Sequence, residues 1–203
     1  MDMKNKIVLK RNEHLHYESD HVHCVYYLVS GSLKTYIHHP SRRNSLTLQL
    51  IDHECYFGYF ELFTNEKLRL SSACVVSKDA LIEKISADDF LNRLKHENMF
   101  CAKILTATIR NEYRLWNRII IYKEYDSFRK IGWMLISIAK PSYSNSDILV
   151  IRGYSHLAIS QYTGSTRPTI SSALKYLKEA KVIEYDKNRI IISKYKMNKL
   201  IGS

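Results

Sequence analysis

Glycine and proline are scarce in this sequence, with six Gly and three Pro among 203 residues. Hydrophobic residues make up 45% and charged residues 25%, a composition typical of a folded chain rather than a disordered one. No apolar run approaches the roughly 18 residues of a membrane span. The first twenty residues contain no apolar segment of the signal-peptide type. We therefore expect a cytoplasmic protein without a membrane partner.

Paired cysteines and catalytic motifs are also absent. The four cysteines, Cys24, Cys55, Cys74 and Cys101, are scattered and form no CxxC pair. We interpret them as reduced thiols of the core or its boundary, with oxidation of an exposed thiol as the alternative. The sequence contains no glycine-rich phosphate loop and no motif that pairs a nucleophile with a base. We therefore expect no enzyme, no catalytic residue and no cofactor.

Histidines are concentrated near the start of the chain. Alternate positions of a strand share one face, so two His-x-His pairs could approach a metal ion. Exposed sheet residues beside acidic ones explain the same pattern, and we predict no metal site. The histidines concerned are His14, His16, His21, His23, His38 and His39.

The net positive charge of the chain lies entirely in its second half. Residues 1–100 contain thirteen Lys or Arg and thirteen Asp or Glu, whereas residues 101–203 contain eighteen and seven. The whole formal charge of +11 therefore lies in the second half. This asymmetry indicates a polyanion binder, although a membrane surface would attract the same charge.

Hydrophobicity alternates with a period of two from about residue 5 to residue 86. Residues 33–38 and 46–50 alternate in this way, and short turn-like segments separate such stretches. The pattern predicts an antiparallel sandwich or roll. We assign residues 1–96 to a β-roll domain, within an α+β fold.

A long helix without Gly or Pro is predicted from about residue 98 to residue 123, after a short helix capped by Ser86. About 26 helical residues extend about 39 Å, which is long for one small core. We therefore predict a dimerisation helix at 97–124, with packing against the chain's own roll as the alternative. Its heptad seam comprises Leu105, Thr108, Glu112, Leu115, Ile119 and Tyr122.

A helix-turn-helix is predicted at residues 154–181, after a helix from Ser127 to Lys140 and a strand at 148–151. Ser155 would cap the first helix, and Gly164 would form the turn. Ser165 or Thr166 would cap the second helix. Pro168 is tolerated there because the first turn of a helix leaves its N–H groups unpaired. An ordinary helical hairpin with a solvated basic face is the alternative.

The second helix has one apolar and one polar face, as a DNA-recognition helix requires. Arg167 can donate two hydrogen bonds to guanine, and nearby hydroxyls can contact bases or phosphates. Segments 182–185 and 190–193 predict a hairpin with a basic tip, so residues 125–203 would form a winged domain. The candidate DNA-binding residues are Ser155, Thr166, Arg167, Pro168, Thr169, Ser171, Ser172, Lys175, Lys187 and Arg189.

Three segments in this order resemble the CRP/FNR family of bacterial transcription regulators, which are related to the cyclic-AMP receptor protein. They are VYYLVSGSLKTYI with Gly31, FGYFELF at 57–63, and LAISQYTGSTRPTISSALKYLKEAKVI. The resemblance implies a jelly roll like that of cyclic-nucleotide-binding domains, a dimer helix and a winged helix-turn-helix. It also implies a homodimer on a palindromic promoter site, with RNA polymerase as a further partner left open.

The family's base-contacting positions fall on Arg167, Pro168 and Ser172. Arg167 matches the family's usual arginine. Pro168 stands where cyclic-AMP-type members have a glutamate, and it cannot accept a hydrogen bond from cytosine. Ser172 stands at a second arginine position. The resemblance therefore does not imply the best-known operator sequence.

The effector region departs further from the family pattern. Tyr59 follows Gly58 where cyclic-AMP binders have a glutamate, and the family's Arg-Ser pair falls on Leu70 and Ser71. Arg69 is one residue away. We expect neither a cyclic-AMP response nor the iron–sulfur cluster of oxygen-sensing members. The candidate pocket, which the chain's own aromatics could fill instead, comprises Gly58, Tyr59, Phe60, Glu61, Leu70 and Ser71.

Two alternatives from other classes stay open at this point. One is a ligand- or metal-sensing module whose basic half binds an acidic partner. The other is a non-specific nucleic-acid binder. Neither requires an Arg-x-Thr helix start after a glycine turn, which is why we favour the regulator.

Overall fold

The computed structural model describes residues 5–38, 45–64, 66–142, 147–152, 155–186 and 189–202. His39 and Lys187, both named above, lie outside these ranges. The chain forms two compact units, residues 1–114 and 115–203, so the division falls within the long helix rather than at its ends. No helix among the described residues is long and apolar enough to cross a membrane.

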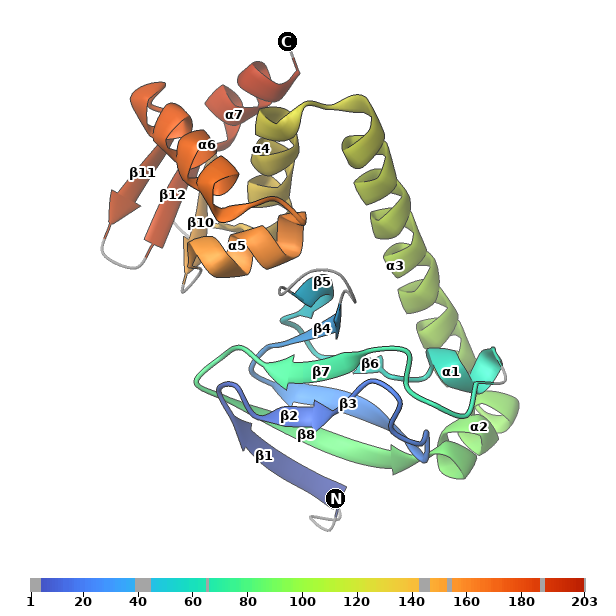
Figure 1. Cartoon of the computed structure of the whole chain (residues 1–203). Coiled ribbons are helices and arrows are strands. Elements are labelled where there is room, and N and C mark those ends of the chain that lie inside the picture. The colour runs from blue at the N-terminus through green and yellow to red at the C-terminus, as the bar shows by residue number, and fades with distance from the viewer. Residues whose placement is uncertain are drawn as a thin grey trace. The chain divides into compact units, whose positions relative to one another are not determined.

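The first unit is a roll of two four-stranded antiparallel sheets, as the period-two pattern predicts (Figure 1). The first sheet has the order β1 (Lys6–Lys10), β8 (Asp79–Ser86), β3 (Cys24–Ser30) and β6 (Cys55–Phe57). The second has the order β2 (His14–His16), β7 (Ser72–Val75), β4 (Leu33–His38) and β5 (Ser45–Ile51).

Apolar side chains from both sheets form the core of this roll. Leu28, Leu33, Ile51 and Ile82 are fully buried within one cluster. All four cysteines are free thiols, and Cys101 is exposed. Burial raises the pKa of the Cys55 thiol to about 11, so that thiol stays protonated and unreactive at neutral pH.

Three helices complete the first unit or begin in it. They are α1 (Phe60–Phe63), α2 (Ala87–His96) and α3 (Asn98–Glu124). The hydroxyl of Ser86 accepts a hydrogen bond from the Asp89 N–H at 3.0 Å, which confirms the predicted cap of α2. The long helix predicted at 98–123 is also confirmed, with one further residue at its end.

The second unit combines a four-stranded antiparallel sheet with helices. Its strands are β9 (Lys140–Pro141), β10 (Ile148–Arg152), β11 (Ile183–Asp186) and β12 (Arg189–Ser193), in the order β11-β12-β10-β9. Its helices after α3 are α4 (Ser127–Ile138), α5 (His156–Thr163), α6 (Arg167–Glu179) and α7 (Lys194–Ile201). The predicted hairpin is confirmed as β11 and β12.

Two elements of this unit differ from the prediction. Helix α4 ends at Ile138 rather than at Lys140. Ala139 is extended, and Lys140 disfavours the helical conformation because it directly precedes Pro141. Helix α7 was not predicted. Its Met197 and Ile201 are buried against α4 at Gly132, where an added Cβ would lie 2.8 Å from Ile201.

Helix α6 ends in a left-handed turn that holds a lysine. Lys181 has φ +56, its N–H donates to the Lys178 carbonyl, and the Val182 N–H donates to the Leu177 carbonyl, both at 2.9 Å. This pair of bonds is the Schellman motif, in which glycine is usual because it has no Cβ to strain.

Lys181→Gly should therefore raise the free energy of unfolding by about 0.5–1 kcal/mol, the relief of strain exceeding the entropy lost by glycine. Urea unfolding followed by tryptophan fluorescence measures this, since Trp116 and Trp133 both lie in the second unit. Lys178→Gly, within the helix, should instead lower the stability by about 1 kcal/mol. A loss of stability in both variants would contradict the strain argument.

Candidate functional site

The turn between α5 and α6 is fixed by side-chain hydrogen bonds. The Ser155 hydroxyl accepts from the Ala158 N–H at 3.1 Å and so caps α5. Gly164 ends α5 with φ +65, a conformation that costs glycine little. Thr166 then caps α6 by accepting from the Thr169 N–H at 3.3 Å. The predicted caps and turn are therefore confirmed.

The buried face of α6 anchors it to the second unit. Ile170, Ala173, Leu174 and Leu177 belong to the core cluster that also contains Ile159 of α5. The opposite face is exposed at Arg167, Pro168, Ser171, Ser172 and Lys175. The polar and basic face therefore starts at Arg167, the first residue of α6. The first turns of a recognition helix are the part that contacts base edges in the DNA major groove.

Some predicted DNA-binding residues also bond within the protein. The Ser171 hydroxyl lies 3.1 Å from Nδ1 of His156, an exposed residue of α5 that is not among the predicted DNA-binding residues. Thr169 is half-buried, and its hydroxyl lies 2.8 Å from that of Thr166. Lys175 Nζ lies 3.9 Å from Glu179. Arg167 and Ser172 are thus the best candidates for base contacts.

The winged hairpin contributes further positive charge. Arg189 is half-buried at the start of β12. Its partner in the register of β10 and β12 is Arg152, which is exposed and was not predicted. The sequence did offer a signal for Arg152. The strand predicted at 148–151 continues through residue 152, and its pairing with the second strand of the hairpin places Arg152 beside Arg189. This basic pair can contact phosphate, and the predicted contact at Lys187 lies outside the described residues.

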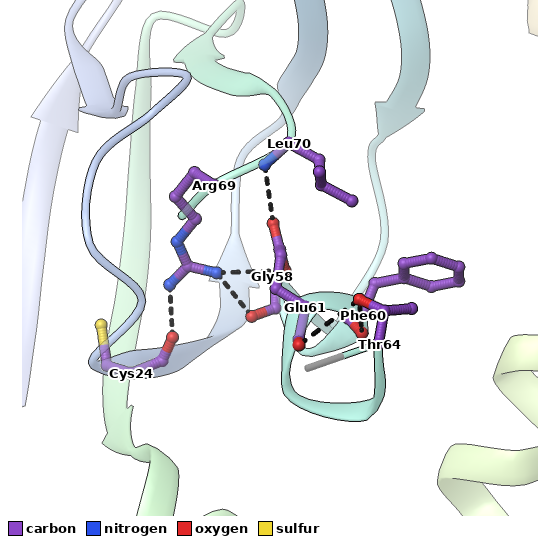
Figure 2. A network of polar contacts seen from close by, with 7 residues as sticks. All are labelled: Cys24, Gly58, Phe60, Glu61, Thr64, Arg69 and Leu70. Carbon is purple, nitrogen blue, oxygen red and sulfur yellow. Dashed lines mark hydrogen bonds and ion pairs between the residues drawn. The ribbon is translucent and has the colours of Figure 1, made fainter. Parts of the chain in front are cut away.

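A buried ion pair occupies the region predicted to hold an effector. Arg69 Nη1 lies 3.4 Å from Glu61 Oε2 of α1, and the two residues are 2% and 5% exposed. Nη1 also donates to the Gly58 carbonyl at 2.7 Å, and Nη2 donates to the Cys24 carbonyl. Figure 2 shows the guanidinium between these groups, with the other Glu61 oxygen accepting from the Leu70 N–H at 3.3 Å.

Close packing around this ion pair requires glycine at position 58. Gly58 has φ +70, and an added Cβ would lie 3.0 Å from Arg69 Nη1 and 3.1 Å from the Tyr26 ring. The Arg69 guanidinium also lies 5.1 Å from the centre of that ring. Protein atoms therefore surround the guanidinium and satisfy its charge.

Aromatic side chains fill the space between α1 and the part of α3 that belongs to the first unit. Tyr59 is buried with Phe90, Phe100 and Ile104, and its ring stacks on Phe90 at 5.7 Å. The Tyr59 hydroxyl lies 3.0 Å from the Thr108 hydroxyl. Burial raises the pKa of Tyr59, so the hydroxyl remains neutral.

The six predicted pocket residues differ in burial and in direction. Tyr59 and Glu61 point into the protein, whereas Phe60 is 60% and Leu70 is 47% exposed. In Figure 2 the Phe60 and Leu70 side chains point away from Arg69. Ser71 is half-buried. Arg69, one position before the residue that matches the family's arginine, is at the centre of these contacts.

The histidines form no metal centre in the part of the chain that the structure describes. His14 Nε2 lies 2.8 Å from the Tyr36 hydroxyl. His16 is buried and stacks on Tyr26 at 5.3 Å. Burial and the nearby Arg69 charge lower the pKa of His16 to about 4, so it is neutral at neutral pH. Both histidines therefore contact tyrosine side chains within the roll.

Helix α3 leaves an apolar face open in each unit. Leu105, Ile109 and Tyr113 are exposed in the first unit. In the second unit the exposed residues are Leu115, Trp116, Ile119 and Ile120.

Two residues of the predicted seam bond within the chain instead. Thr108 bonds Tyr59, and the Tyr122 hydroxyl donates to the Thr163 carbonyl. Ile109, Trp116 and Ile120 lie nearer the middle of the open face than these two residues do. Successive steps of four, seven and four residues lead from Leu105 to them, and such steps keep side chains on one side of a helix.

Comparison with known families accounts for both units. The model of the cyclic nucleotide-binding domain matches residues 6–97, and that of the Crp-like helix-turn-helix domain matches residues 130–197. The chain belongs to the CRP/FNR family of transcription regulators. Its helix-turn-helix is thus the DNA-binding element of this family. No curated protein matches the chain in sequence.

Solved structures of the CRP/FNR family share the fold over nearly the whole chain. FixK2 from Bradyrhizobium japonicum has a TM-score of 0.80 at 14% identity, with 96% of each chain covered. A transcriptional regulator of the CRP/FNR family from Thermus thermophilus, TTHA1359, has a TM-score of 0.76 at 16% identity, with 98% of each covered. At such identities the likeness shows the fold alone.

Proposed function

We propose that this protein is a homodimeric, sequence-specific regulator that binds a palindromic promoter site in the cytoplasm. The exposed face of α6, which begins with Arg167 directly after the Thr166 cap, is the observation on which the proposal rests. The excess of positive charge in residues 101–203 supports it. RNA polymerase is the further partner that a promoter-bound regulator of this family implies.

The dimer is inferred from the open face of α3. Trp116 and Ile119 are 62% and 61% exposed, and a row of such side chains is unfavourable in water unless a partner covers it. A second copy of the same helix offers a matching apolar face. Such a dimer would place two copies of α6 on half-sites about one helical turn of DNA apart.

We infer further that cyclic AMP does not regulate the protein. The Arg69 guanidinium, the cation best able to bind a phosphate here, is paired with Glu61 and with two carbonyl groups. Tyr59 and its aromatic neighbours fill the space beside α3. A nucleotide would have to displace both sets of contacts.

Selection of bound fragments from random duplex DNA tests the function, with the purified full-length protein in the presence and absence of cyclic AMP. We expect a palindrome with half-sites about 10 base pairs apart, recovered equally under both conditions. Recovery of no enriched sequence would refute the proposed function. Enrichment only with cyclic AMP would refute the inference about the effector.

Arg167→Ala should weaken binding to the selected palindrome by about 1–3 kcal/mol per half-site and relax the preference at one base pair. Arg152→Ala is the matched control, because it removes the same side chain at the end of strand β10. Arg152→Ala should weaken binding to all DNA sequences alike. It should also reduce the slope of log affinity against log salt concentration by about one. Fluorescence anisotropy with single-base variants of the site measures both effects. Equal losses on random DNA for the two variants would exclude base contact by Arg167.

A further inference from the structure

The last turn of α5 receives two hydrogen bonds from α3, both within the second unit. Arg118 Nη2 donates to the Tyr162 carbonyl at 2.7 Å, and the Tyr122 hydroxyl donates to the Thr163 carbonyl. The final carbonyls of an α-helix have no partner within the helix, so these donors satisfy groups that would otherwise need water. The end of α5 is thus attached to the long helix.

Ring contacts make this attachment specific. The Arg118 guanidinium lies 5.0 Å from the centre of the Tyr162 ring and 5.9 Å from that of Tyr122. Lys130 Nζ lies 6.0 Å from the Tyr122 ring. Arg118 and Tyr122 are one helical turn apart, and both are half-buried. Their geometry is therefore fixed by packing as well as by hydrogen bonds.

The two bonded carbonyls lie directly before the turn of the helix-turn-helix. Gly164 follows Thr163 in the left-handed conformation. The Ser160 hydroxyl then donates to the Ser165 carbonyl at 2.6 Å, and the Ser165 N–H donates to the Thr163 hydroxyl at 3.2 Å. Helix α6 begins two residues later at Arg167. A shift of the Thr163 carbonyl would therefore move the start of α6.

We propose that Arg118 and Tyr122 are positioning residues for DNA recognition, which hold the turn before α6 in place from the long helix. This inference rests on the proposed function. Arg118 and Tyr122 lie on a different side of α3 from its open face. They are half-buried, whereas Trp116, Ile119 and Ile120 in the same turns are exposed. One side of α3 is thus free for a second copy while another side fixes the turn.

The test measures DNA affinity of the full-length variants Tyr122→Phe and Arg118→Met by anisotropy. The probes are a labelled duplex with the selected palindrome and a random duplex of equal length. We expect affinity for the palindrome to fall about 3- to 10-fold for Tyr122→Phe and about tenfold or more for Arg118→Met. Tyr195→Phe and Arg110→Met are the matched controls, because they change the same groups at exposed positions of α7 and α3, and they should leave the affinity unchanged.

Two further measurements separate positioning from direct contact and from a merely structural role. If Arg118 positions the turn, the slope of affinity against salt stays the same. If Arg118 contacts phosphate, the slope falls by about one and random DNA loses affinity too, which overturns the proposal. Amide exchange at residues 164–166 should quicken in Tyr122→Phe. Faster exchange with unchanged affinity would also overturn it.

Failure of this inference differs from failure of the proposed function. If the wild-type protein selects no sequence, the proposed function fails. If the wild-type protein binds its palindrome and Tyr122→Phe binds equally well, only the positioning role fails. Tyr122→Phe removes one hydroxyl and no charge, so it also tests the proposal should Arg118→Met fail to fold.

Discussion

Arg69→Met should lower the free energy of unfolding of the first unit by about 3–5 kcal/mol, because it leaves the Glu61 carboxylate buried without its cation. Glu61 would retain the Leu70 N–H as a donor, and the carbonyls of Gly58 and Cys24 would lose theirs. Removal of one partner of a buried pair costs far more than the net stabilisation by the pair, because the desolvated charge stays behind.

Two optical signals separate the units in this measurement. Both tryptophans lie in the second unit, so tryptophan fluorescence follows that unit and the proposed dimer contact at Trp116, whereas far-ultraviolet circular dichroism follows both units. In urea, the transition of the first unit should move to lower concentration. Lys175→Met, which removes the cation of an exposed ion pair with Glu179, is the control and should cost about 0.5 kcal/mol or less.

The double variant Arg69→Met/Glu61→Leu tests the physical reason for the loss. Replacement of both charges by apolar side chains leaves no unpaired ion, so much of the stability lost in Arg69→Met should return. A double variant as unstable as the sum of the two single ones would show that the charges act independently. It would also contradict the explanation that the buried carboxylate without its cation causes the loss.

Local signals explain why the helix-turn-helix could be predicted from sequence. Ser155 and Thr166 act through bonds to residues three positions ahead, and Gly164 acts through its own positive φ, so their types alone indicate caps and a turn. The roll was predictable for a similar reason, because alternation along each strand depends only on which face is buried.

Contacts between distant segments explain what the sequence could not predict. Arg69 meets Cys24 across 45 positions of the chain, and nothing near Arg69 distinguishes it from Leu70 as the residue that points inward. Thr108 and Tyr122 fit a heptad seam by spacing, yet their hydroxyls bond Tyr59 and Thr163. Helix α7 forms because Met197 and Ile201 pack against α4, a contact outside its own sequence.

The open face of α3 leads to the other large expected effect. Ile119→Glu should convert the proposed dimer to a monomer, because a carboxylate at a buried helix–helix contact lacks a partner. Affinity for the palindrome should then fall at least 100-fold, since each α6 would bind its half-site without the raised effective concentration that a dimer provides. Sedimentation equilibrium measures the first effect and anisotropy the second.

Arg114→Glu is the matched control for this prediction. It introduces a carboxylate on the same helix at an exposed position. Arg114 lies nine positions after Leu105 and so about 180° around the helix from it. The control should remain dimeric and bind the palindrome. A dimer that survives Ile119→Glu but dissociates on Arg114→Glu would place the contact on another side of α3, and the Trp116 face would then need a different partner.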